Sequence, residues 1–302
     1  MASKPFCIMA AAAALLLIGG CGGGGSSPGP PPVPSPSGSP VPFPLQGPNT
    51  TVIYSPNSAS VALSNGAITS SRLDPTGGGS TITATTDVND NLSSLQFNIV
   101  TPSGTFTHTF SNPVMGNLPY GTLGDLAYLL NQVNTTSGSS TYLGMGTNVL
   151  VSSHYGVWAT NSGGSLSQAG VYAYGNPTPV AAMPTTGAAT YNGTTVGMGS
   201  SASGPFALAG SVQLQANFAN STVTTTIYGL QFQNLATSAV TLQPGLVGTA
   251  TINGNQYSGP LSGAALSGSS TGTFYGPIAS ETTGVWRASG GGTTAIGSYG
   301  AH

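Results

Sequence analysis

Charged side chains are almost missing from this chain of 302 residues, because Asp, Glu, Lys and Arg together make up 3% of it. An ordinary soluble domain carries roughly 25%. The cations are Lys4, Arg72 and Arg287, too few to neutralise a run of phosphates, so nucleic acid is excluded as a partner. The same shortage argues against attraction to anionic lipid headgroups. Polar uncharged residues take their place, and we expect a polar but nearly uncharged surface.

Acidic and imidazole groups are equally scarce, which limits catalysis. They are Asp74, Asp87, Asp90, Asp125, Glu281, His108, His154 and His302. General acid–base hydrolysis needs two positioned carboxyl groups, and no Gly-x-Ser-x-Gly elbow on a strand-to-helix turn accompanies the histidines. The run Asp87–Asn91 lacks the glycine spacing and terminal glutamate of an EF-hand loop, so a polar turn is favoured over a calcium site. We expect no enzyme and no metal site.

Two of the histidines lie in strand-like runs. His154 is interpreted as an ordinary strand histidine rather than a catalytic or metal-binding one. His108 alternates with Phe106 and Phe110 on one strand face, where it could approach a haem, although a packed histidine is favoured. We therefore expect no cofactor.

Cysteine occurs only at Cys7 and Cys21. Residues 1–20 are typical of a signal segment, with an apolar stretch too short for a permanent membrane span. The stretch ends at Leu17–Cys21, "LIGGC", which resembles a bacterial lipobox and implies cleavage before an acylated Cys21. Gly22 after it would favour the outer membrane. The alternative is an ordinary secretory signal with a chance cysteine; on the lipobox interpretation the mature protein has no free thiol.

Residues 21–48 form a Gly/Ser stretch followed by a proline-rich one, which cannot bury a core and extends at about 3.1 Å per residue. This segment is predicted to be a tether. Residues 49–145 contain short β-rich runs bounded by turn residues and are predicted to form a β-rich handle domain. Its one helix is expected near 122–133, because Leu123, Leu126, Ala127 and Leu130 recur at helical spacing behind a capping box.

From residue 146 to 302 the pattern is strand after strand. The stretch "SVQLQANFA", residues 211–219, alternates apolar and polar side chains without error, and Asn253-Gly254 is a strong hairpin signal. About eight such antiparallel strands indicate a sandwich or a barrel. Closure is favoured because the chain lacks the lysines that protect open edges. The predicted fold class is mainly β, with a C-terminal eight-stranded antiparallel barrel after the handle domain.

Four ordered motifs in residues 147–302 then suggest a family. They are Tyr155–Ala159, Met183–Met198, Ala216–Leu230 and the closing stretch "FYGPIASETTGVW", Phe274–Trp286. Their order resembles the β-barrel domain of the transferrin-binding protein B family of bacterial surface lipoproteins. The resemblance implies a barrel preceded by a handle, held by lipid at the outer membrane and displayed on the cell surface. It does not carry over a particular ligand.

Only two charged residues follow Asp125 in the sequence. They are Glu281 and Arg287, and both lie in the closing stretch. Pro277 forbids a ladder bond, so we expect a hairpin in which one or both of these residues make local bonds to the backbone or to each other. Such a surface pair contributes about 0 to 1 kcal/mol, and Glu281→Gln should leave the fold intact. The motif residues are expected to be structural: Phe274, Tyr275, Gly276, Pro277, Glu281 and Trp286.

The resulting prediction is a non-catalytic surface lipoprotein that binds a small apolar ligand, or a host or envelope protein, through its barrel. Tyrosines and tryptophans in the barrel segment supply recognition surface at low entropic cost. One alternative is a structural or accessory envelope lipoprotein without a soluble ligand. In another, the strands themselves span the membrane, but the polar Gln and Asn face of residues 211–219 disfavours it.

Overall fold

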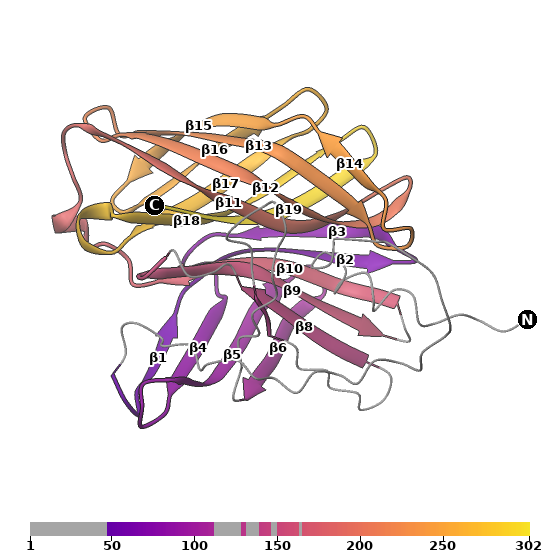
Figure 1. Ribbon diagram of the computed structural model, residues 1–302, viewed down its shortest axis with the longest axis horizontal. Helices are drawn as coiled ribbons and strands as arrows, with labels where there is room; N and C mark the ends of the chain where they lie inside the picture. Colours follow the sequence, from indigo (N-terminus) through magenta and orange to yellow (C-terminus); the bar gives the residue numbers. More distant parts are fainter. Residues whose placement is uncertain (1–46, 112–127, 131–138, 146–149, 163–164) are drawn as a thin grey trace, which may run out of the picture.

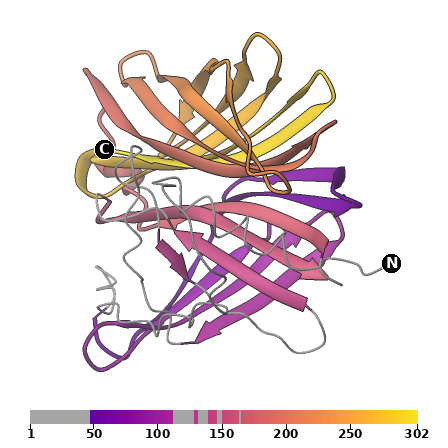
Figure 2. The same cartoon turned by 45° about the vertical axis from the view of Figure 1, so that its right-hand side comes forward.

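The computed structural model describes residues 47–111, 128–130, 139–145, 150–162 and 165–302. The signal segment, Cys21 and nearly all of the tether lie outside the described residues. The described chain forms two open sheets and one closed barrel, stacked in three layers (Figures 1 and 2).

Two antiparallel sheets make up the N-terminal layers. The outer sheet has the order β1-β4-β5-β6, from β1 (Thr51–Tyr54), β4 (Thr81–Thr86), β5 (Leu92–Thr101) and β6 (Gly104–Ser111). The middle sheet has the order β3-β2-β10-β9-β8-β7, from β3 (Ala67–Asp74), β2 (Asn57–Ser64), β10 (Ser165–Gly175), β9 (Ser153–Ser162), β8 (Ser139–Met145) and β7 (Tyr128–Leu130). Every strand pair in both sheets is antiparallel.

The third layer is a closed barrel, which confirms the predicted fold class. Its strands in spatial order are β12 (Gly204–Asn217), β11 (Ala188–Ser201), β19 (Thr293–Ala301), β18 (Glu281–Gly290), β17 (Ser267–Tyr275), β16 (Gln256–Ser262), β15 (Leu246–Asn253) and β13 (Thr222–Asn234). Pairing of β12 with β13 closes the ring of eight strands. A further short strand, β14 (Val240–Gln243), pairs with the far end of β13. The single-turn helices η2 (Val180–Ala182) and η3 (Pro277–Ala279) complete the fold.

The predicted start of the barrel and the predicted helix both need correction. Strands β9 and β10, residues 153–175, pair with each other and with β2 in the middle sheet, although the prediction gave them to the barrel. The ring of the barrel begins at β11, Ala188. The helix predicted near 122–133 falls mostly outside the described residues, and its described part, Tyr128–Leu130, is strand β7, because pairing with β8 overrides the local helical spacing.

The side chains of the middle sheet alternate between its two faces, and a separate hydrophobic core lies on each face. Along β10, Val171 and Ala173 pack toward the barrel wall, whereas Tyr172 and Tyr174 pack toward the outer sheet. Side chains of successive strand residues point to opposite faces, so one strand serves both cores. The barrel is therefore joined to the handle through a buried apolar layer, and Figure 2 shows the middle sheet lying between the other two layers.

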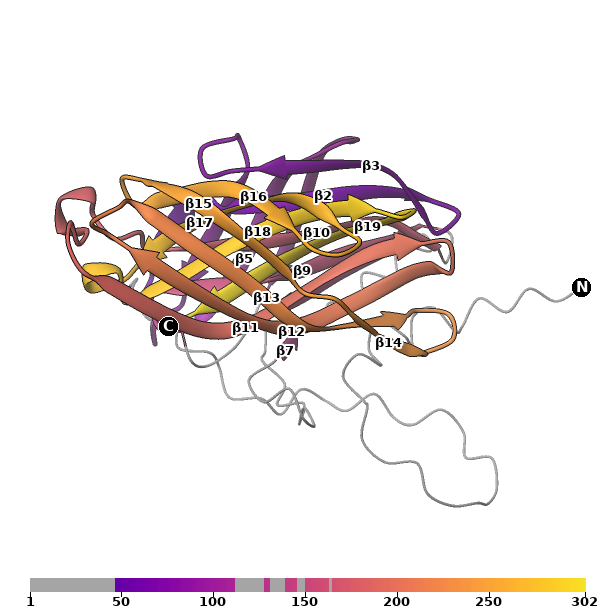
Figure 3. The same cartoon turned by 90° about the horizontal axis from the view of Figure 1, so that it is seen from above.

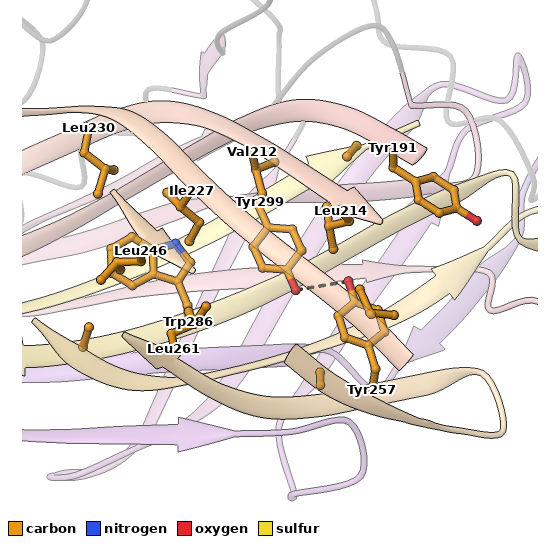
Figure 4. Packing of buried hydrophobic residues seen from close by; sticks show 14 of the residues in the cluster. Tyr191, Val212, Leu214, Ile227, Leu230, Leu246, Tyr257, Leu261, Trp286 and Tyr299 are labelled. Atoms are coloured by element: carbon orange, nitrogen blue, oxygen red, sulfur yellow. Dashed lines mark hydrogen bonds between the residues drawn. The ribbon is translucent and has the colours of Figure 1, made fainter. Parts of the chain in front are cut away.

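The interior of the barrel is filled by its own side chains. Trp286 is fully buried there, and its Nε1–H donates to Thr195 Oγ1 at 2.9 Å. The hydroxyl of Tyr299 donates to that of Tyr257 at 3.1 Å, as Figure 4 shows. The Trp286 ring covers Gly297 on the neighbouring strand, where a Cβ would come within 2.4 Å of it. The core of this barrel therefore combines aliphatic side chains with aromatic rings, of which Trp286 lies directly against strand backbone.

Candidate functional site

The connection between β17 and β18 carries a strained backbone at one end of the barrel. Gly276, Ile278 and Ala279 have φ values of 73°, 51° and 60°. Glycine adopts such values freely, but a β-branched residue there is an outlier that costs about 1–2 kcal/mol. Strain of this kind persists only where the surrounding contacts fix the loop.

Buried hydrogen bonds from two other segments fix it. Thr178 Oγ1 donates to the carbonyl of Gly276 at 2.7 Å, and the Thr178 N–H donates to the carbonyl of Phe274 at 2.9 Å. From the start of the barrel, the buried Tyr191 hydroxyl donates to the carbonyl of Ala279 at 2.7 Å. The loop is thus held on both sides of Ile278, whose own side chain takes no part.

The outcome is an exposed apolar protrusion beside a hollow. Ile278 is 73% exposed and Val180, on the facing turn η2, is 63% exposed. The hollow has a volume of about 430 Å³ and no Asp, Glu, Lys or Arg in its lining, which includes Pro184, Tyr191, Phe218, Ile278 and Ala279. We call Val180, Ile278 and this hollow the apolar tip. The lining also includes the polar side chains of Thr186, Thr190, Ser280 and His302, so the hollow suits a partner side chain that is mainly apolar.

Glu281 follows this loop directly and corrects the expectation of a local surface pair. Its carboxylate is buried and accepts the N–H of Val151 at 2.6 Å, the N–H of Ser152 at 3.0 Å and the Ser153 hydroxyl at 2.9 Å. These partners lie about 130 residues earlier, at the start of β9. The glutamate of the barrel therefore fastens the middle sheet to the barrel.

Arg287 also bonds across the layers rather than to Glu281. Its Nη1 donates to the carbonyl of Ser71 on β3 at 3.4 Å. Asp74, at the end of the same strand β3, forms an ion pair with Arg72 at 3.1 Å and accepts the N–H of Ser80. Glu281 and Arg287 thus both form hydrogen bonds between the barrel and the handle.

The remaining motif residues build the barrel end. Phe274 is fully buried, with ring contacts to Tyr191, Phe218 and Tyr257 at 5.2–5.9 Å between centroids. Tyr275 is buried, Pro277 begins η3 after Gly276, and Trp286 fills the interior. Phe274 thus contacts Tyr191 and Phe218, which line the hollow of the apolar tip.

The candidate catalytic and metal groups do not come together. Among the described residues, no cluster of three or more His, Cys, Asp or Glu could hold a metal ion. Asp87 accepts the N–H groups of Asn91 and Asn89, and these bonds lower the pKa of its carboxyl as in a polar turn. A Gly-x-Ser-x-Gly spacing does occur at 268–272, but it runs through strand β17 with Ser270 buried, so it makes no nucleophile elbow.

The two strand histidines lie in aromatic surroundings. His108, on β6, lies beside Phe106 and Phe110, with ring centroids 6.2 and 4.4 Å away, and burial lowers its pKa. His154, on β9, is 5.4 Å from the Tyr174 ring, and burial lowers its pKa to about 4. Strand β9 belongs to the middle sheet, so His154 is not the barrel residue that the sequence suggested.

Acid should destabilise the fold through His154. Its pKa is about 4 in the folded protein, against about 6.5 in the unfolded chain. Between these values the unfolded chain binds a proton that the native state does not, so stability falls as pH falls, by about 2 kcal/mol at pH 5. Urea unfolding at pH 7 and pH 5 should show this loss. His154→Gln should remove that part of the pH dependence; a slope equal to that of the wild type would contradict the assignment.

Comparison with known proteins finds one family model. It describes the C-lobe and N-lobe beta barrels of Tf-binding protein B and matches residues 183–302. A search of curated protein sequences gives no match to the chain. None of the described helices is long and apolar enough to cross a membrane.

Several solved structures are similar to the chain. Intact Ap-TbpB, with its N and C lobes, has 10% identity and a TM-score of 0.44 over 85% of this chain and 77% of that one. A mutant transferrin-binding protein B from Haemophilus parasuis has 12% identity and a TM-score of 0.42 over 73% of this chain and 53% of that one. The protein from serogroup B Neisseria meningitidis has 15% identity and a TM-score of 0.40, over 74% and 51%.

Proposed function

Because residues 183–302 match the family model of the C-lobe and N-lobe β-barrels of transferrin-binding protein B, we propose that this chain is a non-catalytic surface lipoprotein that binds a protein partner through its barrel. The partner meets the apolar tip from outside. Cys21 carries the lipid, and the Pro- and Gly-rich segment 21–48 separates the folded layers from the outer membrane.

One observation carries the binding role: Ile278 is held in a left-handed conformation and is 73% exposed beside the hollow. A loop whose backbone is already fixed loses little further backbone entropy when a partner binds, which favours recognition. The interior is filled by Trp286, Tyr257 and Tyr299, so a loop of a partner protein suits this barrel better than a solute inside it. Since the lining holds no Asp, Glu, Lys or Arg, binding should depend little on salt.

The test compares substitutions at the tip with one on the outer wall. Protein purified with its lipid from the native envelope should capture a discrete partner, and Ile278→Asp should weaken capture by about 10-fold to 100-fold, as for a central apolar contact. Ile278→Gly relieves the backbone strain and should keep or raise stability by up to about 1 kcal/mol while also losing the partner.

Val247→Asp is the matched control, because Val247 is 49% exposed on β15 and lies outside the tip lining. It should bind like the wild type. Equal capture by all the variants, or no partner at all with every variant folded by circular dichroism, would leave the structural or accessory role as the better explanation.

A further inference from the structure

Strand β14 leaves one edge of its ladder open. Among the described strands it pairs only with β13, through Leu230–Gln233 opposite Val240–Gln243. Figure 3 shows it at the margin of the barrel, beyond the stretch where β15 accompanies β13. Leu242 is 76% exposed and Val240 is 42% exposed. Within the described part of the chain, the strand therefore presents unpaired main-chain groups together with exposed apolar side chains.

Nothing in this strand protects that edge. Natural edge strands are shielded by lysine, proline, bulges or inward charges, but the sequence of β14 is Val-Thr-Leu-Gln, and its register with β13 is unbroken. The strand has no charge to repel an identical strand. It is short, which limits the strength of any association.

The register decides which groups face outward. The N–H of Asn234 donates to the carbonyl of Ala239 at 2.9 Å, which marks this as a hydrogen-bonded pair of the hairpin. Bonded and non-bonded pairs alternate along an antiparallel ladder. Thr241, two residues on, therefore bonds to β13, whereas the N–H and C=O groups of Val240 and Leu242 point away from it.

We propose that β14 is the contact surface for a second copy of this chain, paired antiparallel about a two-fold axis at Thr241. In this register Thr241 lies opposite Thr241 of the other copy. Val240 of each copy lies opposite Leu242 of the other. The outward groups of Val240 and Leu242 then meet in about four main-chain hydrogen bonds. The same register stacks the exposed apolar side chains on one face, so hydrogen bonding and apolar contact agree.

A two-fold contact is favoured over an unrelated strand because the edge is complementary to itself. An isologous interface requires that residue i meets j while j meets i, and the pairing of Val240 with Leu242 across the two-fold axis meets this requirement. Four residues bury little area, so the dimer should be weak and dependent on concentration. The inference does not depend on the proposed partner, since the apolar tip shares no residue with β14.

Disulfide trapping tests the register. Thr241→Cys is placed in the full chain with Cys7→Ser and Cys21→Ser, so that the introduced thiol is the only one. Opposed residues of a non-bonded pair have Cα atoms about 4.5 Å apart, within reach of a disulfide. Mild oxidation should yield a covalent dimer. Thr249→Cys is the control, because Thr249 is also exposed but lies on β15, which is paired on both sides.

Sedimentation velocity of the chain with Cys7→Ser and Cys21→Ser, without an introduced cysteine, gives an independent test. Its sedimentation coefficient should rise with protein concentration, and Leu242→Lys should abolish the rise by placing charges at the contact while circular dichroism stays unchanged. Equal cross-linking at positions 241 and 249, or a monomer at every concentration, would overturn the proposal. So would a cross-link from Thr241→Cys that Leu242→Lys leaves undiminished.

Discussion

Replacing Glu281 by alanine should lower the free energy of unfolding by about 3–5 kcal/mol, because three hydrogen-bond donors lose a charged acceptor and each such loss costs about 1–3 kcal/mol. The carboxylate is 5% exposed and accepts bonds from the N–H groups of Val151 and Ser152 and from the Ser153 hydroxyl. Alanine would leave the buried Ser153 hydroxyl and the part-buried N–H groups of Val151 and Ser152 without this acceptor. Because they begin β9 while Glu281 begins β18, the junction between handle and barrel should loosen first.

The two tryptophans allow the unfolding of the handle and of the barrel to be measured separately. Trp158 lies between the two handle sheets and Trp286 lies inside the barrel, so fluorescence of single-tryptophan variants in urea follows each layer separately. Glu281→Gln keeps the size of the side chain but replaces one carboxylate oxygen by an NH₂ donor, which cannot accept from the N–H groups. It should lower the free energy of unfolding by about half as much as the alanine substitution. Arg287→Gln, which loses one bond of 3.4 Å, should cost less than about 1 kcal/mol. A Glu281→Ala protein as stable as Arg287→Gln would contradict the role of the carboxylate.

Trp286→Ala should destabilise the barrel by about 3–5 kcal/mol, because it empties the largest side chain from a closed interior. The indole is fully buried, and its removal also leaves Thr195 Oγ1 without the N–H that it accepts at 2.9 Å. The ring of strands cannot collapse onto the void without breaking its pairing. Trp286→Phe keeps most of the volume and should cost clearly less.

Urea unfolding monitored by far-ultraviolet circular dichroism measures the Trp286 series. The handle offers a matched control, Trp158→Phe, which changes the same residue type outside the barrel. If Trp286→Ala cost no more than Trp286→Phe, the interior would not be the tightly packed core described above.

The barrel could be predicted from sequence because its evidence is local. The alternation of residues 211–219 placed Val212, Leu214 and Ala216 inside, and all three are buried in the barrel core. Asn253-Gly254 forms the predicted hairpin, with Gly254 at φ 61° and Asn253 opposite Gln256. Each feature depends on neighbours in the chain, and so short-range patterns were enough.

The junction between the layers could not be predicted, because its partners are distant in sequence. Strands β9 and β10 alternate in the same way as barrel strands, and only their pairing with β2 assigns them to the handle. The bonds of Glu281 span about 130 residues. The left-handed conformation of Ile278 had no signal either, since isoleucine is a residue type that ordinarily avoids it.

Photo-cross-linking on intact cells tests the proposed function most directly. A photoreactive amino acid at position 278 should give one discrete adduct to a partner protein, because that side chain stands at the exposed apolar tip. The same probe at Tyr228, which is 47% exposed on β13, should not give that adduct. No adduct at position 278 in folded protein, or the same adduct at both positions, would contradict binding through the tip.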